Sequence, residues 1–262
     1  MTGVRLSANL GFLFADMDLP AAIHAAHQAG FAAVELHWPY ATPAGAVRAA
    51  VEATGLPILG LNTVRGDARN GEFGLAALPG READARAAID EAIAYARAIG
   101  CRNVHVMAGR ADGAEAERTF VANLAYAAEE ARGHGIGILI EPLNLRDVPG
   151  YFLTDLAAAA RIVAAVGADN LAIMFDCYHM QIMGGDLLNR LRAHMPLIGH
   201  VQFAAVPDRQ EPDHGELDFA WLLPAIADAG YDGFFGAEYR PRGATGDGIG
   251  WMGRFIEETG KE

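Results

Sequence analysis

The 262-residue sequence predicts an α/β fold, a single (β/α)8 TIM barrel in which residues 1–262 form one domain. Eight short apolar segments of strand character alternate with eight helical segments, which is the order of a parallel sheet with crossover helices. No linker rich in Pro, Gly or Ser divides the chain. A doubly wound open sheet is the competing layout, but residues 7–14 lack the glycine fingerprint of its nucleotide-binding form.

In the first half of the chain, four strand signals alternate with four helix signals. Asp18 and Pro20 indicate a helix start, because aspartate is favoured at the N-cap and proline in the first turn. Gly30 and Gly55 then end the first two helices. We expect strands at residues 4–10, 33–36, 57–61 and 103–107, and helices at residues 18–30, 43–54, 80–99 and 114–134.

The segment between the third strand and the third helix, residues 62–79, shows no clear hydrophobic period. It is rich in glycine and long for a connection inside a compact domain. Loops of this length usually close over ligands or bind them. We therefore expect a lid or a binding loop here.

The second half repeats the pattern, and its clearest strand ends in the run GILIEPLN at residues 137–144. Its apolar residues suit a strand buried on both faces, and Pro142 marks the strand end because proline has no N–H. Thr154 is expected to cap the next helix. We expect strands at residues 137–141, 171–176, 198–202 and 233–238, helices at residues 154–166, 185–194, 218–229 and 249–258, and loops at residues 177–179 and 207–215.

Composition and charge limit the classes of partner. The net charge of −13 argues against nucleic acid and anionic membranes, which the overall field would repel. Cys101 and Cys177 form no metal-binding spacing, and the first 20 residues do not resemble a signal peptide, so we expect a cytoplasmic protein. A small molecule is the expected partner, and a homo-oligomer stays open.

Four of the predicted strands end on a side chain that carries oxygen: Glu141, Asp176, Gln202 and Glu238. The carboxyl ends of parallel strands lie on one face, where barrel enzymes have their active sites. An all-oxygen set of this kind suits Mg²⁺ or Mn²⁺ better than zinc. Each acid alone is equally consistent with a helix cap or a partner for a nearby basic residue, but four at matching positions favour a site.

Other polar side chains are predicted on the same face. His179 follows Asp176 by three residues and is expected either to donate to a substrate oxygen or to bond a loop carbonyl. Arg209, in the loop after the seventh strand, is a candidate for bidentate binding of a substrate carboxylate. Substrate contact and a supporting role are both open for Glu35, Asn62 and His105. His37, Trp38 and Tyr40 are expected either to form a wall over the site or to pack near the strand end.

Taken together, these motifs resemble the hydroxypyruvate isomerase family of xylose isomerase-like TIM barrels over nearly the whole chain. The combination is specific, whereas each motif alone is weak. The resemblance is carried by NL (9–10), VE (34–35), PY (39–40), LPGRE (78–82), IEPLN (140–144), PGYFL (149–153), FDCYHMQ (175–181), GHVQ (199–202) and EYRP (238–241).

The resemblance implies isomerisation of hydroxypyruvate to tartronate semialdehyde through an enediol. It also implies that Glu141 and Glu238 exchange the proton and that both, with Asp176 and Gln202, hold a divalent metal. Related sugar epimerases carry histidine at the position of Gln202, whereas hydroxypyruvate isomerases share the glutamine. An enediol reaction needs a base, an acid and positive charge near the developing oxyanion, and these residues supply that set.

Three alternatives remain open at this point. The first is an isomerase or epimerase of a longer substrate, such as a 2-oxo-tetronate or a ketose, with identical chemistry. The second is the endonuclease branch of the superfamily, which the acidic charge and the few histidines at the strand ends disfavour. The third is a barrel that only binds a small acid.

Overall fold

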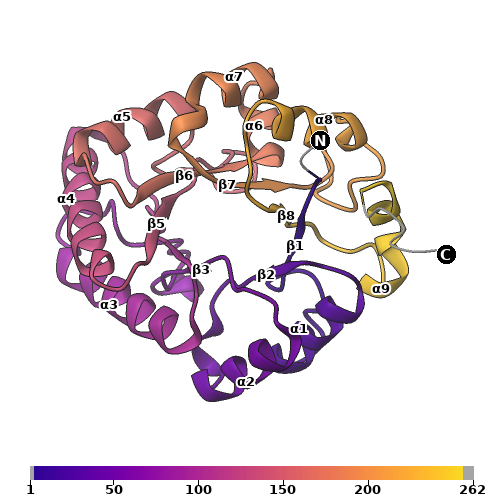
Figure 1. The fold of residues 1–262 in the computed structure, drawn as a ribbon. Coiled ribbons are helices and arrows are strands. Elements are labelled where there is room, and N and C mark those ends of the chain that lie inside the picture. Colours follow the sequence, from indigo (N-terminus) through magenta and orange to yellow (C-terminus); the bar gives the residue numbers. More distant parts are fainter. Residues whose placement is uncertain (1–2, 256–262) are drawn as a thin grey trace.

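Eight strands and nine α-helices make up the part of the chain that the computed structural model describes, residues 3–255 (Figure 1). The strands are short, and each predicted strand has a counterpart. They are β1 (Leu6–Asn9), β2 (Ala33–Glu35), β3 (Leu61–Asn62), β4 (Asn103–His105), β5 (Gly137–Ile140), β6 (Leu171–Asp176), β7 (Ile198–Phe203) and β8 (Phe235–Ala237).

All paired strands are parallel and follow the order β2-β1-β8-β7-β6-β5-β4-β3. Between β2 and β3, a parallel bridge joins Val34 to Ile58, and Leu36 N–H donates to Gly60 C=O at 2.9 Å. These contacts bring the two ends of the sheet together. The predicted (β/α)8 barrel is therefore confirmed.

Helices surround the barrel, as Figure 1 shows, and most lie where the sequence predicts them. They are α1 (Leu19–Gln28), α2 (Ala44–Thr54), α3 (Glu82–Ile99), α4 (Gly113–Arg132), α5 (Leu156–Val166), α6 (Cys177–Met183), α7 (Leu187–His194), α8 (Phe219–Asp228) and α9 (Thr245–Gly248). Single turns of 3-10 helix are η1 (Pro39–Ala41), η2 (Ala68–Asn70) and η3 (Met195–Leu197), and η4 (Ile249–Arg254) follows α9.

The third strand and the start of α5 differ from the prediction. Of residues 57–61, only Ile58 and Leu61 pair as strand, because Pro57 offers no N–H and Gly60 interrupts the run. Asp155 caps α5 in place of Thr154, since its carboxylate accepts from Ala157 N–H at 2.7 Å.

The chain after β6 and the end of the chain also differ. Residues 177–179 form the first turn of α6 rather than a loop, because Asp176 both ends β6 and accepts from Tyr178 N–H at 2.8 Å as an N-cap. The predicted helix at residues 249–258 is a 3-10 helix up to Arg254, and its last residues lie outside the described range.

Residues 62–79 run across the carboxyl end of β4 and are anchored there by the backbone. Gly74 N–H donates to Arg65 C=O at 3.0 Å, and Ala77 N–H donates to Ala108 C=O at 2.7 Å. Ala76 and Ala77 are buried. The segment expected as a lid is therefore held against the barrel in its second half.

Alternation along the strands separates an apolar outer layer from a more polar barrel interior. On β5, Ile138 and Ile140 pack against the helices, whereas Leu139 points inward, as does the residue at which the strand ends, Glu141. No helix among residues 3–255 has the length and apolar character that crossing a membrane requires.

Candidate active site

A cavity of about 280 Å³ opens at the carboxyl ends of the strands. Six predicted site residues line it, and three others lie deeper in the barrel. The lining residues are Asn62, His105, Glu141, His179, Arg209 and Glu238, and the deeper ones are Glu35, Asp176 and Gln202. Aromatic side chains of Phe12, Trp38 and Phe73 form part of the wall.

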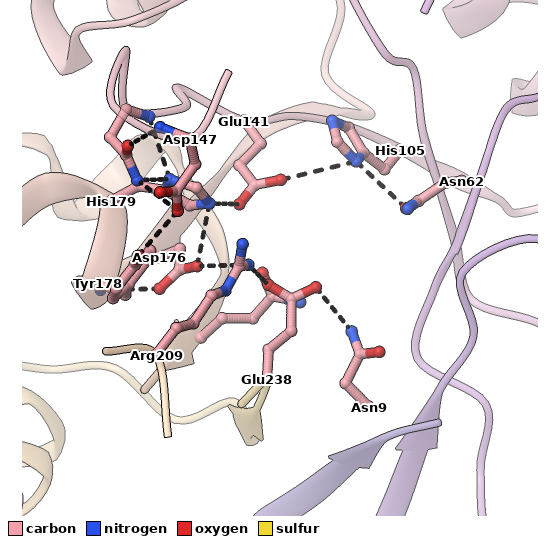
Figure 2. Close-up of polar contacts among 12 residues, drawn as sticks. Asn9, Asn62, His105, Glu141, Asp147, Asp176, Tyr178, His179, Arg209 and Glu238 are labelled. Atoms are coloured by element: carbon pink, nitrogen blue, oxygen red, sulfur yellow. Dashed lines mark hydrogen bonds and ion pairs between the residues drawn. The ribbon is translucent and has the colours of Figure 1, made fainter. Parts of the chain in front are cut away.

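Three buried carboxylates meet at this cavity, from the ends of β5, β6 and β8 (Figure 2). Burial, together with the charges of Glu238 and Asp176, raises the pKa of Glu141 well above its usual value. Burial also raises the pKa of Asp176 to about 7. The negative charges of the three carboxylates repel one another, so the site favours a cation or a proton between them.

Glu238 has the opposite environment, because three side chains donate to its carboxylate. Arg209 Nη2 lies 2.5 Å from Glu238 Oε2, and His37 Nε2 and Asn9 Nδ2 lie 2.8 Å and 3.0 Å from Oε1. Burial alone would raise the pKa of Glu238, but the Arg209 and His37 contacts outweigh it and lower that pKa. Glu238 is thus held ionised.

Arg209 is the internal counter-ion of this cluster. Its guanidinium also lies 3.6 Å from Asp176 Oδ2 and is stacked 5.1 Å from the ring centre of Phe12. The backbone of Arg209 has a left-handed φ of 57°, and Arg240 N–H donates to Arg209 C=O at 2.7 Å. A single cation therefore balances part of the charge of Glu238 and Asp176.

The protonation of His179 follows from its backbone contact. Asn144 N–H lies 3.0 Å from His179 Nδ1, and because an amide can only donate, Nδ1 is the acceptor. Burial lowers the pKa of His179 to about 3, so the ring is neutral at pH 7 and its proton is on Nε2. Nε2 lies 3.5 Å from Asp176 Oδ2 and 3.8 Å from Glu141 Oε1. His179 is therefore a hydrogen-bond donor at the cavity.

Asn62 and His105 approach Glu141 from the other side, from the ends of β3 and β4 (Figure 2). His105 Nδ1 lies 3.2 Å from Asn62 Oδ1 and 3.8 Å from Glu141 Oε2. Burial lowers the pKa of His105 to about 4, so this ring is also neutral. The two residues offer polar atoms to a ligand without adding charge.

Beneath the cavity, Glu35 organises a buried polar layer. Ser7 Oγ donates to Glu35 Oε1 at 2.5 Å, His200 Nε2 lies 3.0 Å from the same oxygen, and Gln202 Nε2 donates to Glu35 Oε2 at 2.7 Å. Glu35 does not line the cavity. Its contact with Gln202 fixes which end of that amide is the oxygen.

Among the described residues, three of the four predicted metal ligands carry a buried oxygen that has no hydrogen-bond partner. These atoms are Glu141 Oε1, Asp176 Oδ2 and Gln202 Oε1. Unpartnered buried oxygens are costly unless a donor or a cation satisfies them. Glu141, Asp176 and His179 also form a buried group whose potential ligand atoms lie within 4.8 Å of one another. The donor set therefore fits a divalent cation.

The sequence pattern did not identify every residue of the site. Asp147 accepts from Tyr178 Oη at 2.8 Å and lies in a connection without periodicity. Arg65 and Phe73 line the cavity from the segment at residues 62–79, where no strand or helix pattern indicates a direction. The Glu-Pro-Leu-Asn run was a usable signal for Asn144, because it continues directly from a strand end.

A (β/α)8 barrel with buried acids and histidines at the carboxyl ends of its strands has the arrangement of a barrel enzyme. The chain belongs to the xylose isomerase-like TIM barrel family, whose model matches residues 23–255. It is an isomerase of this family, as relatives over nearly its full length indicate.

Two such relatives carry names of isomerases. A Mus musculus protein named "Putative hydroxypyruvate isomerase" is 44% identical over 99% of this chain and 98% of its own length. The 2-oxo-tetronate isomerase of Cupriavidus necator is 45% identical over 96% of this chain and 98% of its own length.

Solved structures give the same fold. A Brucella melitensis structure described as an AP endonuclease of family 2 has a TM-score of 0.93 and 38% identity, and the match covers 97% of this chain and all of that one. The 3-keto-D-glucoside 4-epimerase of E. coli has a TM-score of 0.79 at 21% identity, over 96% of this chain and 99% of that one. The second likeness supports the fold alone.

Proposed function

We propose that the protein interconverts hydroxypyruvate and tartronate semialdehyde (2-hydroxy-3-oxopropanoate) by proton transfer through an enediol. The observation that carries the proposal is that Glu141 and Glu238 enter one cavity from strands three positions apart in the barrel. Two carboxylates in opposite environments are suited to act as acid and base on one substrate. The relatives named for hydroxypyruvate and 2-oxo-tetronate support this substrate class.

The proposed reaction moves one hydrogen between neighbouring carbons. The ionised carboxylate of Glu238 removes a proton from the hydroxymethyl carbon, and the electron pair forms the enediol double bond while the ketone oxygen takes up negative charge. Glu141, which lines the same cavity, returns a proton to the former ketone carbon. The proton of the neighbouring hydroxyl passes to the former ketone oxygen, so the hydroxymethyl carbon becomes the aldehyde and the ketone oxygen becomes a hydroxyl group. The reverse reaction exchanges the two roles.

His179 and Arg209 assist at the substrate oxygens. The Nε2–H group of His179 donates to the oxygen that gains negative charge, which lowers the barrier in a buried site. Arg209, predicted to bind the substrate carboxylate, holds Glu238 ionised through its contact at 2.5 Å.

We further propose that Glu141, Asp176, Gln202 and Glu238 hold a divalent metal, with Mg²⁺ or Mn²⁺ the best match to their oxygens. Bound there, the ion would act as a Lewis acid on the carbonyl and hydroxyl oxygens of the substrate. His179 is left out of the set, because its Nε2 carries the proton and has no free lone pair.

The alternatives differ in substrate or in chemistry. A four-carbon 2-oxo-tetronate is the second candidate, since a relative at 45% identity bears that name and the reaction is the same. An endonuclease with several zinc ions fits less well, because the described residues contain one metal-ligand group with a single histidine. A barrel that only binds would not need Glu141 and Glu238 in one cavity.

The test is proton exchange in D₂O, followed by NMR, with hydroxypyruvate, a 2-oxo-tetronate and a ketose as substrates. We expect deuterium at the hydroxymethyl carbon of hydroxypyruvate and the signals of tartronate semialdehyde. Glu141→Gln and Glu238→Gln should each lower kcat about 100- to 10,000-fold. The exposed Glu52→Gln is the matched control. Near-normal turnover in Glu141→Gln with metal bound would refute the role of Glu141 in proton transfer. Exchange with the ketose alone would refute the substrate class.

A further inference from the structure

Three arginines line the cavity, and they differ in how they are paired. Arg209 is bound to Glu238 and close to Asp176. Arg240 is exposed at the rim, 5.7 Å from the ring centre of Phe12. The side chain of Arg65 is half-buried and forms neither an ion pair nor a hydrogen bond with any residue of the described range 3–255.

Several arginines of the described residues lack a side-chain partner, Arg240 included, but of these two in the cavity only Arg65 is half-buried. Arg65 also lies at a wall where the buried acids do not reach it, since Glu141 is approached on that side by His105. A half-buried guanidinium that lacks a carboxylate partner offers its N–H groups to a ligand. Arg65 is therefore a half-buried cation of the cavity that no described protein group neutralises.

Arg65 is held in place by stacking rather than by hydrogen bonds. Its guanidinium carbon lies 4.1 Å from the ring centre of Trp38 and 6.0 Å from that of Phe73. Trp38 is itself fixed, because its indole N–H donates to Thr63 C=O at 3.0 Å. Stacking on a face leaves the edges of the guanidinium free, and those edges are the groups that bind a carboxylate in a bidentate way.

The backbone around Arg65 is anchored as well. Thr63 N–H donates to His105 C=O at 2.9 Å, Thr63 Oγ1 accepts from Met107 N–H at 3.1 Å, and Gly74 N–H donates to Arg65 C=O. The two Thr63 contacts tie the start of the 62–79 segment to the end of β4 and the residues after it, and the Gly74 contact closes the loop that follows Arg65. The guanidinium is therefore placed before any ligand binds, which lowers the entropy cost of binding.

We propose that Arg65, stacked on Trp38, is the subsite for the carboxylate of the substrate. This inference rests on the proposed function and narrows its substrate class to 2-oxo acids, because a neutral ketose would leave the guanidinium unmatched in the cavity. Asn62 and His105, on the same wall, supply polar atoms beside the subsite. Arg209 then acts as the counter-ion of Glu238 and Asp176 and does not bind the substrate carboxylate.

The test compares hydroxypyruvate with dihydroxyacetone, which carries a neutral CH₂OH group in place of the carboxylate. In Arg65→Gln, we expect kcat/KM for exchange on hydroxypyruvate to fall about 10- to 100-fold, mainly through KM, while exchange on dihydroxyacetone changes less than twofold. Arg65→Lys should restore part of the loss. Arg86→Gln is the matched control, since Arg86 stacks on Tyr126 at 5.0 Å on the outer surface.

Binding of glycerate, which cannot isomerise, separates this inference from the proposed function. We expect Arg65→Gln to weaken glycerate binding about 10- to 100-fold in calorimetry, and Arg86→Gln to leave it unchanged. Weaker glycerate binding in Arg65→Gln alone, in a protein that shows no isomerase activity, would support the subsite and refute the proposed reaction. Unchanged glycerate binding in Arg65→Gln, or loss confined to Arg209→Gln, would overturn the subsite whether or not the enzyme is active.

Discussion

Arg209→Gln is expected to destabilise the metal-free protein strongly. The guanidinium of Arg209 is 12% exposed and lies 2.5 Å from Glu238 and 3.6 Å from Asp176. Removing one partner of a buried ion pair costs about 3–5 kcal/mol, because the remaining charge stays buried. In a protein of this size, each kcal/mol lowers Tm by about 2–4 °C. The expected decrease in Tm is therefore about 6–20 °C.

Calorimetric unfolding with a chelator, and then with saturating Mg²⁺ or Mn²⁺, measures this effect. The exposed pair of Arg132 and Asp169 provides the control, since Arg132→Gln should cost at most about 1 kcal/mol. A divalent cation should reduce the difference in Tm between Arg209→Gln and the parent protein, because the bound cation again places positive charge beside Glu238 and Asp176. A Tm within 2 °C of the parent in chelator would refute the counter-ion role, and an unchanged difference with metal would refute the ligand set.

Two further predictions concern residues around the carboxylates. Glu35→Leu should weaken Mg²⁺ or Mn²⁺ binding about 10- to 100-fold in calorimetry, because the Gln202 amide then loses the acceptor that orients its oxygen. Unchanged affinity would contradict that role. The pKa of His179 is about 3 in the folded protein and about 6.5 unfolded, so the unfolded state takes up the proton first and stability falls as pH decreases below about 6.5. In urea unfolding at pH 7, 6 and 5, His179→Gln should reduce that slope by up to about 1.4 kcal/mol per pH unit, and an equal slope would show that His179 is not held neutral.

The strand ends were the part of the site that the sequence could locate. Glu141, Asp176 and Glu238 each end an apolar run, and parallel strands end on one side of the barrel, so proximity follows from topology alone. A sequence pattern does not show an element boundary where one residue has two roles. Asp176 ends β6 and also caps α6, so a helix starts without the separating turn that marks other boundaries.

Pairing between side chains could not be predicted, because it depends on loops. Arg209 follows no periodic pattern, and its position beside Glu238 arises from the path of the chain after β7. The same holds for Arg65, whose place in the cavity follows from backbone bonds to the end of β4. The sequence predicted a lid or a binding loop at residues 62–79, but it could not show which side chain of that segment would line the cavity.

Two donors of Asn144 hold the proton of His179 on Nε2: its side-chain Nδ2 lies 2.7 Å from His179 Nδ1, and its backbone amide lies 3.0 Å from the same atom. Every amino acid except proline keeps that amide, so most substitutions at Asn144 would leave the hydrogen-bond donor in the cavity unchanged. Neighbouring side chains can therefore vary, in natural drift or in directed evolution towards other acids, while the donor persists. A donor contact made by a backbone amide is thus kept apart from the side chains of the cavity wall, which substitution can change.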